Sequence, residues 1–334
     1  MKKITAISLT FVLILGLFLT SCGEKADMAG EFVLAAEPAP ELLSEAEGLL
    51  SDFITCYENK DAAGAVSLFA SEVEATEESL AEYFETVHEY SDAPYVPGDI
   101  YYIKNLPDTA GNVKVKKSAE DENYIEFTPI DGEFFYAYYT ADSELESRMM
   151  TFILLKEGDK LKIQHTNPAV YEFNGKDANA YFEETKRLSD EGKTVAAYIS
   201  SCMLGTVLRP GGHYRYANDT EMEDLCYQMY LGITDKFALP LALSDTTNAS
   251  LGQVDFIFDD TYGAIPRLLF KTDVPITDKA ALTAEANKVV DALEKLSPGL
   301  RESFDYLRAD ATNDELGENA DSIKSDYVII PLKK

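Results

Sequence analysis

Histidine and tyrosine side chains are the clearest candidates for chemistry in the first half of the chain. Only three histidines occur in 334 residues, and His165, at the end of a predicted strand, is the best placed to act as a general base. Tyr136 and Tyr138 share one face of another predicted strand, where an aromatic cavity would suit sugars or apolar ligands. We favour the simpler interpretation, in which His165 hydrogen-bonds nearby backbone and the tyrosines pack in the core.

A short basic and aromatic segment is the corresponding candidate in the second half. Residues 209–216 combine arginine, histidine and tyrosine in an otherwise acidic chain, and they could hold a carboxylate or phosphate ligand. The side chains that would bind it are Arg209, His213 and Arg215. The alternative, which we favour, is that the arginines form ion pairs with neighbouring acidic residues such as Asp219 and Glu221.

The motifs of several enzyme classes are missing. Neither Ser-x-x-Lys nor Gly-x-Ser-x-Gly occurs, so the nucleophiles of penicillin-binding proteins and α/β-hydrolases are not predicted. No Cys-x-x-Cys pair and no Cys/His cluster occurs, so no zinc-type metal site is expected. The sequence therefore predicts neither a metal nor a cofactor.

The cysteines have different expected roles. Cys56 lies on the apolar face of a predicted helix and is expected to be a small core residue. Cys202 and Cys226 lie on two consecutive predicted helices and could form a disulfide in an oxidising compartment. Spacing along the chain says nothing about the distance between the two sulfur atoms. A disulfide and two free thiols therefore stay the two alternatives.

The chain is strongly acidic. It has 29 Lys and Arg residues against 59 Asp and Glu residues, a formal net charge of −30. Affinity for nucleic acid comes largely from Lys and Arg that displace counterions, so nucleic acid is not an expected partner. Hydrophobic residues make up 46% of the chain, which is too many for a disordered protein and predicts folded cores.

The first half predicts an α+β domain over residues 41–166. Apolar residues recur at helical spacing from Glu41 to Tyr57, a short helix follows, and Thr76 stands where a helix N-cap is expected. The pattern then changes to period two and is interrupted by turn residues, which indicates antiparallel hairpins. The predicted strands are 100–103, 113–116, 124–127, 134–140, 151–155 and 161–165.

The second half predicts a separate α+β domain over residues 176–334, after a linker at 167–175 that contains Pro168 and Gly175. Helical spacing over 181–203 fits one long helix or two consecutive ones, and Thr277 is the expected cap of a later helix. We expect these helices to pack on a small antiparallel sheet. The other predicted elements are a helix at 222–233, a hairpin at 254–270 and strands at 303–308 and 327–332.

The N-terminus resembles the signal of a bacterial lipoprotein. Lys2 and Lys3 precede an apolar stretch that ends in Leu19-Thr20-Ser21-Cys22. The resemblance implies cleavage after residue 21, a lipid on Cys22, and attachment to the extracytoplasmic face of the cell membrane. Residues 22–40 would then form a flexible tether. The alternatives are an ordinary cleaved signal and an uncleaved anchor helix.

Residues 41–166 resemble the nuclear-transport-factor-two-like cone, in which a curved antiparallel sheet wraps over a long N-terminal helix. The resemblance is carried by a helix, a short break that contains Asp, and a Leu-Phe pair. The matching residues are Phe53, Tyr57, Asn59-Lys60-Asp61, Ala65, Leu68 and Phe69. Membership would imply a fold and a pocket but no particular activity.

Together these features predict a surface-tethered lipoprotein that binds a ligand without catalysing a reaction. Its partners would be the membrane, through Cys22, and a small molecule, a glycan or an envelope protein. The alternative is a cone-type isomerase, dehydratase or hydrolase that uses His165 and pocket tyrosines. A role only in supporting envelope assembly is a third hypothesis.

Overall fold

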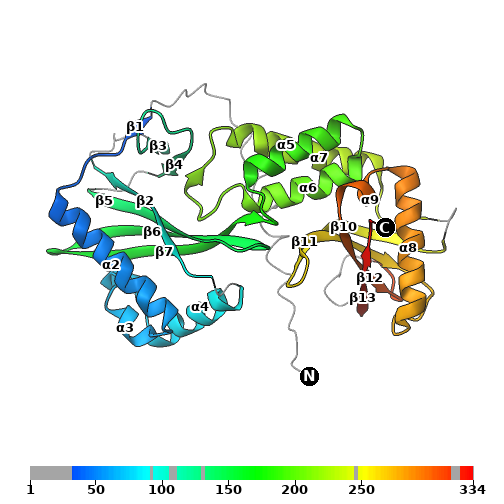
Figure 1. The fold of residues 1–334 in the computed structure, drawn as a ribbon, viewed down its shortest axis with the longest axis horizontal. Helices are drawn as coiled ribbons and strands as arrows, with labels where there is room; N and C mark the ends of the chain where they lie inside the picture. Colours follow the sequence, from blue (N-terminus) through cyan, green and yellow to red (C-terminus); the bar gives the residue numbers. More distant parts are fainter. Residues whose placement is uncertain are drawn as a thin grey trace.

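The computed structural model describes residues 32–90, 93–104, 111–128, 132–243, 247–316 and 324–333. The predicted signal segment, Cys22 and residues 23–31 of the predicted tether lie outside these residues. Residues 33–40 do not form the predicted tether, because Val33–Leu34 pair with another strand and Pro40 begins a helix. The described chain has the predicted α+β class, and its elements form two neighbouring lobes (Figure 1). We call residues 32–173 the first lobe and residues 178–333 the second lobe.

Helices open the first lobe, as predicted. They are α2 (Pro40–Glu58), α3 (Ala62–Val66) and α4 (Glu77–Tyr90), with the 3-10 turn η2 (Ser71–Val73) before α4. The apolar stripe of α2 is buried, and Phe53 is completely inaccessible to solvent. At the start of α4 the Ser79 N–H donates to Thr76 Oγ1 (3.1 Å) and the Thr76 N–H donates to Ser79 Oγ (3.0 Å). Serine thus takes the capping-box position that Glu or Gln usually occupies.

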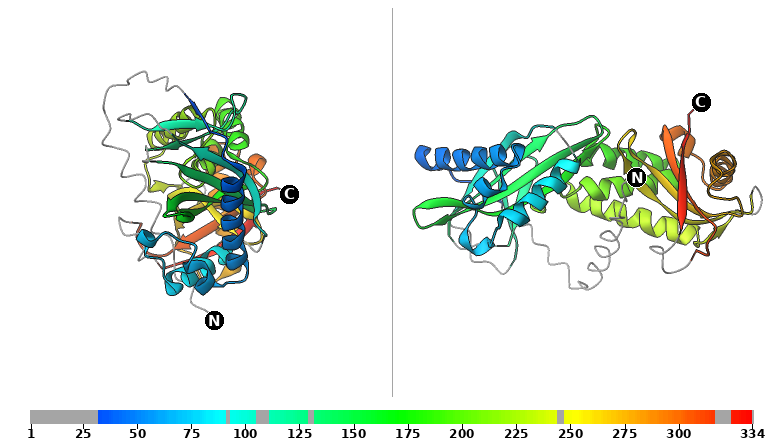
Figure 2. Two further views of the ribbon diagram at one scale, coloured as in Figure 1. Left: turned by 90° about the vertical axis from the view of Figure 1, so that its left-hand side faces the viewer. Right: turned by 90° about the horizontal axis from the view of Figure 1, so that it is seen from below.

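A four-stranded antiparallel sheet, which we call the main sheet, forms the centre of the first lobe. The strand order is β2-β5-β6-β7, with bounds Val96–Ile103, Phe134–Ala141, Glu146–Glu157 and Lys160–Phe173. Helix α2 lies along one face of the sheet (Figure 2), where Phe135 and Phe152 join the helices in one core. Phe134 and Tyr136 lie on the opposite face, so the alternation predicted for this strand is confirmed.

A second, smaller sheet covers that opposite face. Its order is β1-β3-β4-β8, with bounds Val33–Leu34, Val113–Lys116, Tyr124–Phe127 and Tyr214–Arg215. Val115, Ile125 and Phe127 pack there against Tyr136 and Ile153 of the main sheet. The 113–127 hairpin was predicted, but its separation from the main sheet was not, because period-two alternation marks strands without identifying their partners.

The predicted linker at residues 167–175 is mostly strand. Strand β7 continues to Phe173, and Pro168 pairs with β6. Since β7 is an edge strand, the missing N–H of Pro168 need not interrupt the hydrogen bonds to β6. Asn174 and Gly175, which both have positive φ, make the turn into the second lobe.

The second lobe begins with α5 (Ala178–Asp190), α6 (Thr194–Val207) and α7 (Asp219–Lys236). Residues 181–203 therefore form two helices, which meet at Gly192 with a φ of 74°. The N-terminus of α5 is capped by Asp177, whose Oδ1 accepts the Ala180 N–H at 2.9 Å.

A five-stranded sheet forms the rest of the second lobe. Its order is β13-β12-β11-β10-β9, with bounds Ser325–Pro331, Tyr306–Thr312, Gly263–Lys271, Ser250–Asp259 and Leu241–Ala242. The predicted antiparallel sheet contains one parallel pair, β11 with β12. Helices α8 (Lys279–Leu296) and α9 (Leu300–Ser303) connect these two strands, and such a crossover brings the chain back in the same direction.

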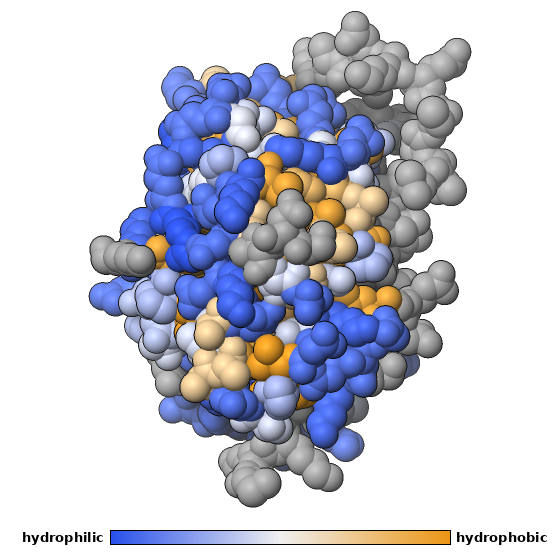
Figure 3. Space-filling view, turned by 90° about the vertical axis from the view of Figure 1, so that its right-hand side faces the viewer, coloured by the Kyte–Doolittle hydropathy of each residue, from blue (hydrophilic) through white to orange (hydrophobic). Residues whose placement is uncertain are grey.

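The N-cap of helix α8 lies one residue later than predicted. The Ala281 N–H donates to Asp278 Oδ1 at 3.0 Å, so the cap is Asp278 and not Thr277. Figure 1 shows α8 on one side of the sheet and α5, α6 and α7 on the other. The outer end of this lobe is mainly hydrophilic, with small apolar patches between the polar residues (Figure 3). Among the described residues, no helix combines the length and the apolar composition that crossing a membrane requires.

Candidate functional site

A cavity of about 300 Å³ lies where the two lobes meet, and we call it the junction pocket. The first lobe contributes residues around β4 and from β5, β6 and β7, and the second contributes residues at the start of α5 and around β8. The lining residues are Asn123, Tyr138, Thr140, Met149, Tyr171, Glu172, Gly175, Asp177, Tyr214 and Tyr216. The volume is at the lower end of the range for small-molecule sites, so the cavity suits a small ligand.

The main sheet positions one wall of the pocket. Tyr138 and Thr140 are two residues apart on β5, so both side chains point away from the helices. Their partners across the sheet are Thr151 and Met149 of β6. Tyr171 follows near the end of β7. The wall therefore depends on the part of β7 that continues beyond the predicted end of the strand.

Residues 209–216 fasten the second lobe to the first. Strand β8 pairs with β4 and so completes the small sheet of the first lobe. Thr151 Oγ1 donates to the Gly211 carbonyl oxygen at 3.3 Å. A Cβ at residue 211 would lie 2.1 Å from Thr151 Cγ2, and Gly211 has a φ of +68°, so both space and backbone conformation require glycine. The same segment carries Tyr214 and Tyr216 into the pocket lining.

The arginines of this segment are held by acidic neighbours. Arg215 Nε lies 3.0 Å from Glu126 Oε2 and 3.9 Å from Asp219 Oδ2. Arg209 forms an ion pair with Glu223. Neither arginine lines the junction pocket. The guanidinium groups thus position the segment, in agreement with the ion-pair interpretation, although Glu223 takes the place expected of Glu221.

The two candidate histidines also lie outside the pocket lining. His213 stacks on Phe127 with ring centroids 4.5 Å apart, and its Nδ1 lies 3.0 Å from the Glu126 carbonyl oxygen. His165 pairs with Ile153 part-way along the edge strand β7, and its side chain is exposed to solvent. Partial burial lowers the pKa of both imidazoles, so both favour the neutral form.

The two candidate tyrosines differ in position. Tyr136 is fully buried between the two sheets of the first lobe, and within the described residues its hydroxyl has no hydrogen-bond partner. Tyr138, two residues further along β5, lines the junction pocket. Of the candidate residues named from the sequence, Tyr138 alone belongs to this lining.

Hydrogen bonds orient three of the four lining tyrosines. Burial raises the pKa of all four hydroxyls, so they stay protonated at neutral pH. The Tyr138 hydroxyl donates to Asp99 Oδ2 (2.9 Å) and the Tyr171 hydroxyl donates to Asp142, whereas the Tyr214 hydroxyl accepts from Asn123 Nδ2 (2.7 Å).

Two carboxyl groups, Glu172 and Asp177, give the pocket its charge. Partial burial raises the pKa of Glu172, and the nearby carboxylates of Asp142 and Asp177 raise it further. No Lys or Arg is among the lining residues that the structure describes. The pocket is therefore acidic and is not neutralised by its own lining.

Sequence reasoning missed most of this pocket because Tyr171 and Glu172 fell in the predicted linker. A signal was present in composition: Val170, Tyr171 and Phe173, beyond Pro168, are residue types that favour strands. Asp177, directly before a helical run, also has the position of an N-cap. Nothing local links these residues to Tyr214, which lies in the other lobe.

The proposed disulfide is not formed in this structure. Cys202, Cys226 and Cys56 are free thiols. Cys226 Sγ donates to the Ser201 carbonyl oxygen at 3.4 Å, so this thiol has a partner other than sulfur. Burial raises the pKa of Cys202 and Cys226 to about 12, which keeps both in the weakly reactive thiol form.

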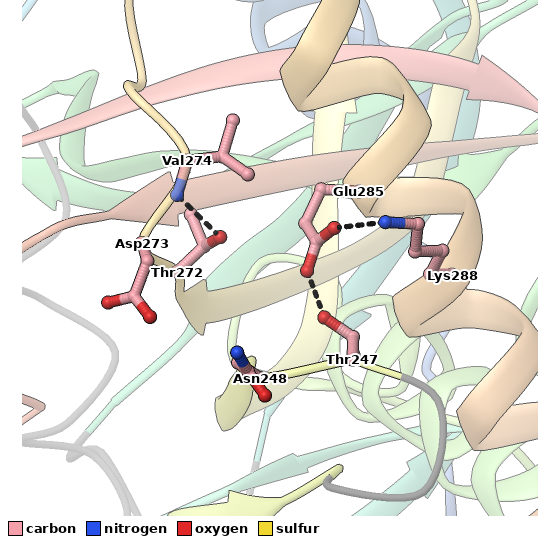
Figure 4. Close-up of a pocket in the computed structure, with 7 residues that line it drawn as sticks. All are labelled: Thr247, Asn248, Thr272, Asp273, Val274, Glu285 and Lys288. Atoms are coloured by element: carbon pink, nitrogen blue, oxygen red, sulfur yellow. Dashed lines mark hydrogen bonds and ion pairs between the residues drawn. The ribbon is translucent and has the colours of Figure 1, made fainter.

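A second cavity, of about 340 Å³, lies beside α8, and we call it the α8 pocket. Its lining residues are Thr247, Asn248, Thr272, Asp273, Val274, Glu285 and Lys288. Figure 4 shows the Glu285 carboxylate between Thr247 and Lys288. The Thr247 hydroxyl donates to it, and Lys288 Nζ lies 3.0 Å from Glu285 Oε2. The buried carboxylate is therefore satisfied by the lining itself.

Comparison with known proteins does not identify a family. No protein-family model matches the chain, and no curated protein matches its sequence. Among solved structures, the protein Aln2 from a Streptomyces species aligns with 40% of this chain and 94% of its own, at 12% identity and a TM-score of 0.26. A similarity of that size carries no argument about fold or function.

Proposed function

We propose that this protein is a lipid-anchored, extracytoplasmic binding protein that takes one small molecule into the junction pocket. The observation that carries the proposal is a cavity walled by four tyrosines from both lobes. Aromatic walls bury a large area of ligand at little entropic cost, which is typical of binding sites. A ligand in this position contacts both lobes and stabilises their junction.

Binding is favoured over catalysis by the state of the lining groups. The lining contains no histidine or cysteine among the described residues. The tyrosine hydroxyls have a raised pKa, and three of the four already have partners, so they are poor proton acceptors near neutral pH. Under this proposal the ligand leaves the pocket chemically unchanged.

The extracytoplasmic position rests on the lipobox-like end of the N-terminal segment at Cys22. Residues 23–31, if flexible, would span roughly 15 to 18 Å, by the square-root law for flexible linkers. That distance lifts the first lobe clear of the lipid headgroups. The junction pocket is then reachable by molecules in the aqueous layer outside the membrane.

The anchor is tested on Cys22. Mass spectrometry of the native protein should show a mature chain that begins at a diacylated Cys22, and Cys22→Ser should release the protein from the membrane fraction. Cys56→Ser is the matched control, because Cys56 belongs to the helical core of the first lobe. A native chain that retains Met1, or an unmodified Cys22, contradicts this part of the proposal.

The pocket is tested by ligand screening on the full-length protein in detergent. A library of small polar metabolites, including compounds that bind to aromatic side chains, is screened by thermal shift. Binding of the hits is then measured by calorimetry. Tyr214→Leu should abolish the shift. Tyr230→Leu should not, because Tyr230 is 41% exposed on α7 and is absent from the lining. Equal binding to both variants would place the ligand elsewhere, and chemical turnover of the ligand would contradict a binding role.

A further inference from the structure

The charge and aromatic content of the junction pocket restrict the class of its ligand. Its ten lining residues include four tyrosines and two acidic residues, and no Lys or Arg is among them. A carboxylate or phosphate ligand would meet repulsion from Glu172 and Asp177 without a compensating cation. Tyrosine ring faces attract cations, because the ring quadrupole places negative charge on the face.

The ring geometry suits a compact cation. The Tyr214 ring centroid lies 5.8 Å from that of Tyr138 at an interplanar angle of 76°, and 5.5 Å from that of Tyr216 at 85°. The Tyr214 ring thus stands nearly perpendicular to each of the other two rings. A cation in such a corner contacts more than one ring without any rearrangement of the backbone.

The hydrogen bonds of the tyrosines strengthen this arrangement. The Tyr138 hydroxyl donates a hydrogen bond to Asp99, and the Tyr171 hydroxyl donates one to Asp142. A phenol that donates to a carboxylate carries more negative charge on its oxygen and ring, which increases its attraction for a cation. Since these hydroxyl protons are already engaged, the lining has fewer free donors for a neutral sugar.

Asp99 is paired with Lys117, but no Lys or Arg lies beside Glu172 and Asp177 in the described lining, and a cationic ligand would supply that counter-charge. Asp142 and Asp177 lie close enough to Glu172 to raise its pKa, which reports repulsion between the carboxylates. A bound cation would reduce that repulsion. The apolar parts of Thr140 and Met149 provide contacts for alkyl groups on the same ligand.

We propose that the junction pocket binds a small organic ammonium ion, such as a quaternary or N-methylated amine. This inference rests on the proposed function and specifies its ligand class. The cation is held by the rings of Tyr138, Tyr214 and Tyr216 and by the negative charge of Glu172 and Asp177. The alkyl groups on the nitrogen of such a ligand fill the rest of the pocket. A metal ion with its oxygen ligands would not fill that volume.

The test compares charged and neutral ligands of the same shape. Calorimetry on the full-length protein, in a detergent without an ammonium group, measures choline, tetramethylammonium, the neutral isostere of choline with carbon in place of nitrogen, glucose and acetate. Choline and tetramethylammonium should bind. The neutral isostere should bind at least about tenfold more weakly, which corresponds to the loss of a desolvated cation–π contact.

Variants separate the contribution of the Tyr214 ring to choline binding from that of the Glu172 charge. Tyr214→Leu should weaken choline binding about tenfold, whereas Tyr214→Phe, which keeps the ring, should stay within about threefold. Glu172→Gln should also weaken it. The matched controls are Tyr230→Leu and Glu221→Gln on α7, which should bind like the original protein because neither residue lines the pocket.

The outcomes separate this inference from the proposed function. If the isostere or glucose binds as well as choline and Tyr214→Leu abolishes that binding, the pocket is a binding site but the ammonium inference is overturned. If choline binds equally to the original protein and to Tyr214→Leu, choline binds outside the junction pocket and the proposed location of the site is wrong. If no probe binds, the ammonium inference is overturned, and the library screen then decides the proposed function independently.

Discussion

The two cavities are similar in volume and opposite in electrostatic design. The α8 pocket, of about 340 Å³, encloses a carboxylate that Thr247 and Lys288 already satisfy. The junction pocket, of about 300 Å³, has two acidic residues and no cationic residue in its lining. In the first case Lys288 balances Glu285 within one lobe, and Asp273 is a further acidic residue of the lining. In the second no cationic residue of the described lining balances Glu172 and Asp177.

This difference shows that volume is a poor guide to a ligand site. A cavity whose polar groups are satisfied by each other gains little from a ligand, which would have to replace those contacts. A cavity with rigid aromatic walls and uncompensated charge gains from a complementary ligand at once. The junction pocket is therefore the better candidate, although the α8 pocket is slightly larger.

The largest expected effect comes from opening the junction itself. Gly211→Val places a branched side chain against Thr151 at a positive φ, and we expect the free energy of unfolding to fall by about 3 kcal/mol. Urea denaturation measures the change, and ligand binding should be lost with it. Gly205→Ala on α6, where an added Cβ meets no atom within 4 Å, is the control and should not destabilise. Unchanged stability of Gly211→Val would mean that residues 209–216 do not fasten the lobes.

Glu285 and Glu172 should respond in opposite ways when each carboxylate is replaced by the neutral amide of glutamine. Glu285→Gln should lower the free energy of unfolding by about 1 to 2 kcal/mol, because it weakens a buried charged hydrogen bond. Glu172→Gln should leave it unchanged or raise it slightly, because repulsion with Asp142 and Asp177 is removed. Denaturation at neutral pH measures both. If Glu172→Gln lowered the free energy of unfolding more than Glu285→Gln, the difference proposed between the two carboxylates would be contradicted.

The wall of the α8 pocket depends on the cap of α8. Asp278→Ala should cost about 1 kcal/mol, since the cap bond to the Ala281 N–H is lost. Thr277→Ala, one residue earlier, should be close to neutral. Thermal denaturation of the two variants side by side distinguishes the observed cap from the one expected from the sequence. A greater cost at Thr277 would restore the original assignment.

The smallest expected effect is a pH dependence from Glu172. Its pKa is raised in the folded state, so the folded protein binds the proton more tightly than the unfolded chain. The contribution of this group to stability is therefore fully present below the ordinary pKa of 4.5 and is lost as the pH rises through the higher folded-state pKa. The carboxylates of Asp142 and Asp177 face this group, and both contribute to the shift.

The measurement is the difference between the original protein and Glu172→Gln in urea denaturation across this pH range. The original protein should lose slightly more stability than the variant as the pH rises. Saturating choline, if it binds as proposed, should remove the difference. Parallel pH profiles without ligand would show that Glu172 does not titrate abnormally.

Local elements of the fold could be predicted closely, and the candidate site could not. The helix from Glu41, the strands at 113–116 and 124–127, and the alternation of Phe134 to Tyr139 follow from spacing alone, because neighbours along the chain determine them. The end of β7 was missed because Pro168 suggests a boundary, whereas an edge strand tolerates it. Of the pocket lining, only Tyr138 was predicted as a ligand-binding residue, although Tyr214 and Tyr216 belong to the segment 209–216 that the sequence singled out.

What the sequence by itself determined is the α+β class, the acidic surface, and the position of most helices and strands, since these depend on composition and short-range periodicity. What only the tertiary structure decided is that β8 pairs with β4 across the lobes and that Tyr138, Glu172 and Tyr214 face one cavity. Such pairings depend on packing between segments far apart in the chain. No local pattern encodes which distant strand or loop will be the partner.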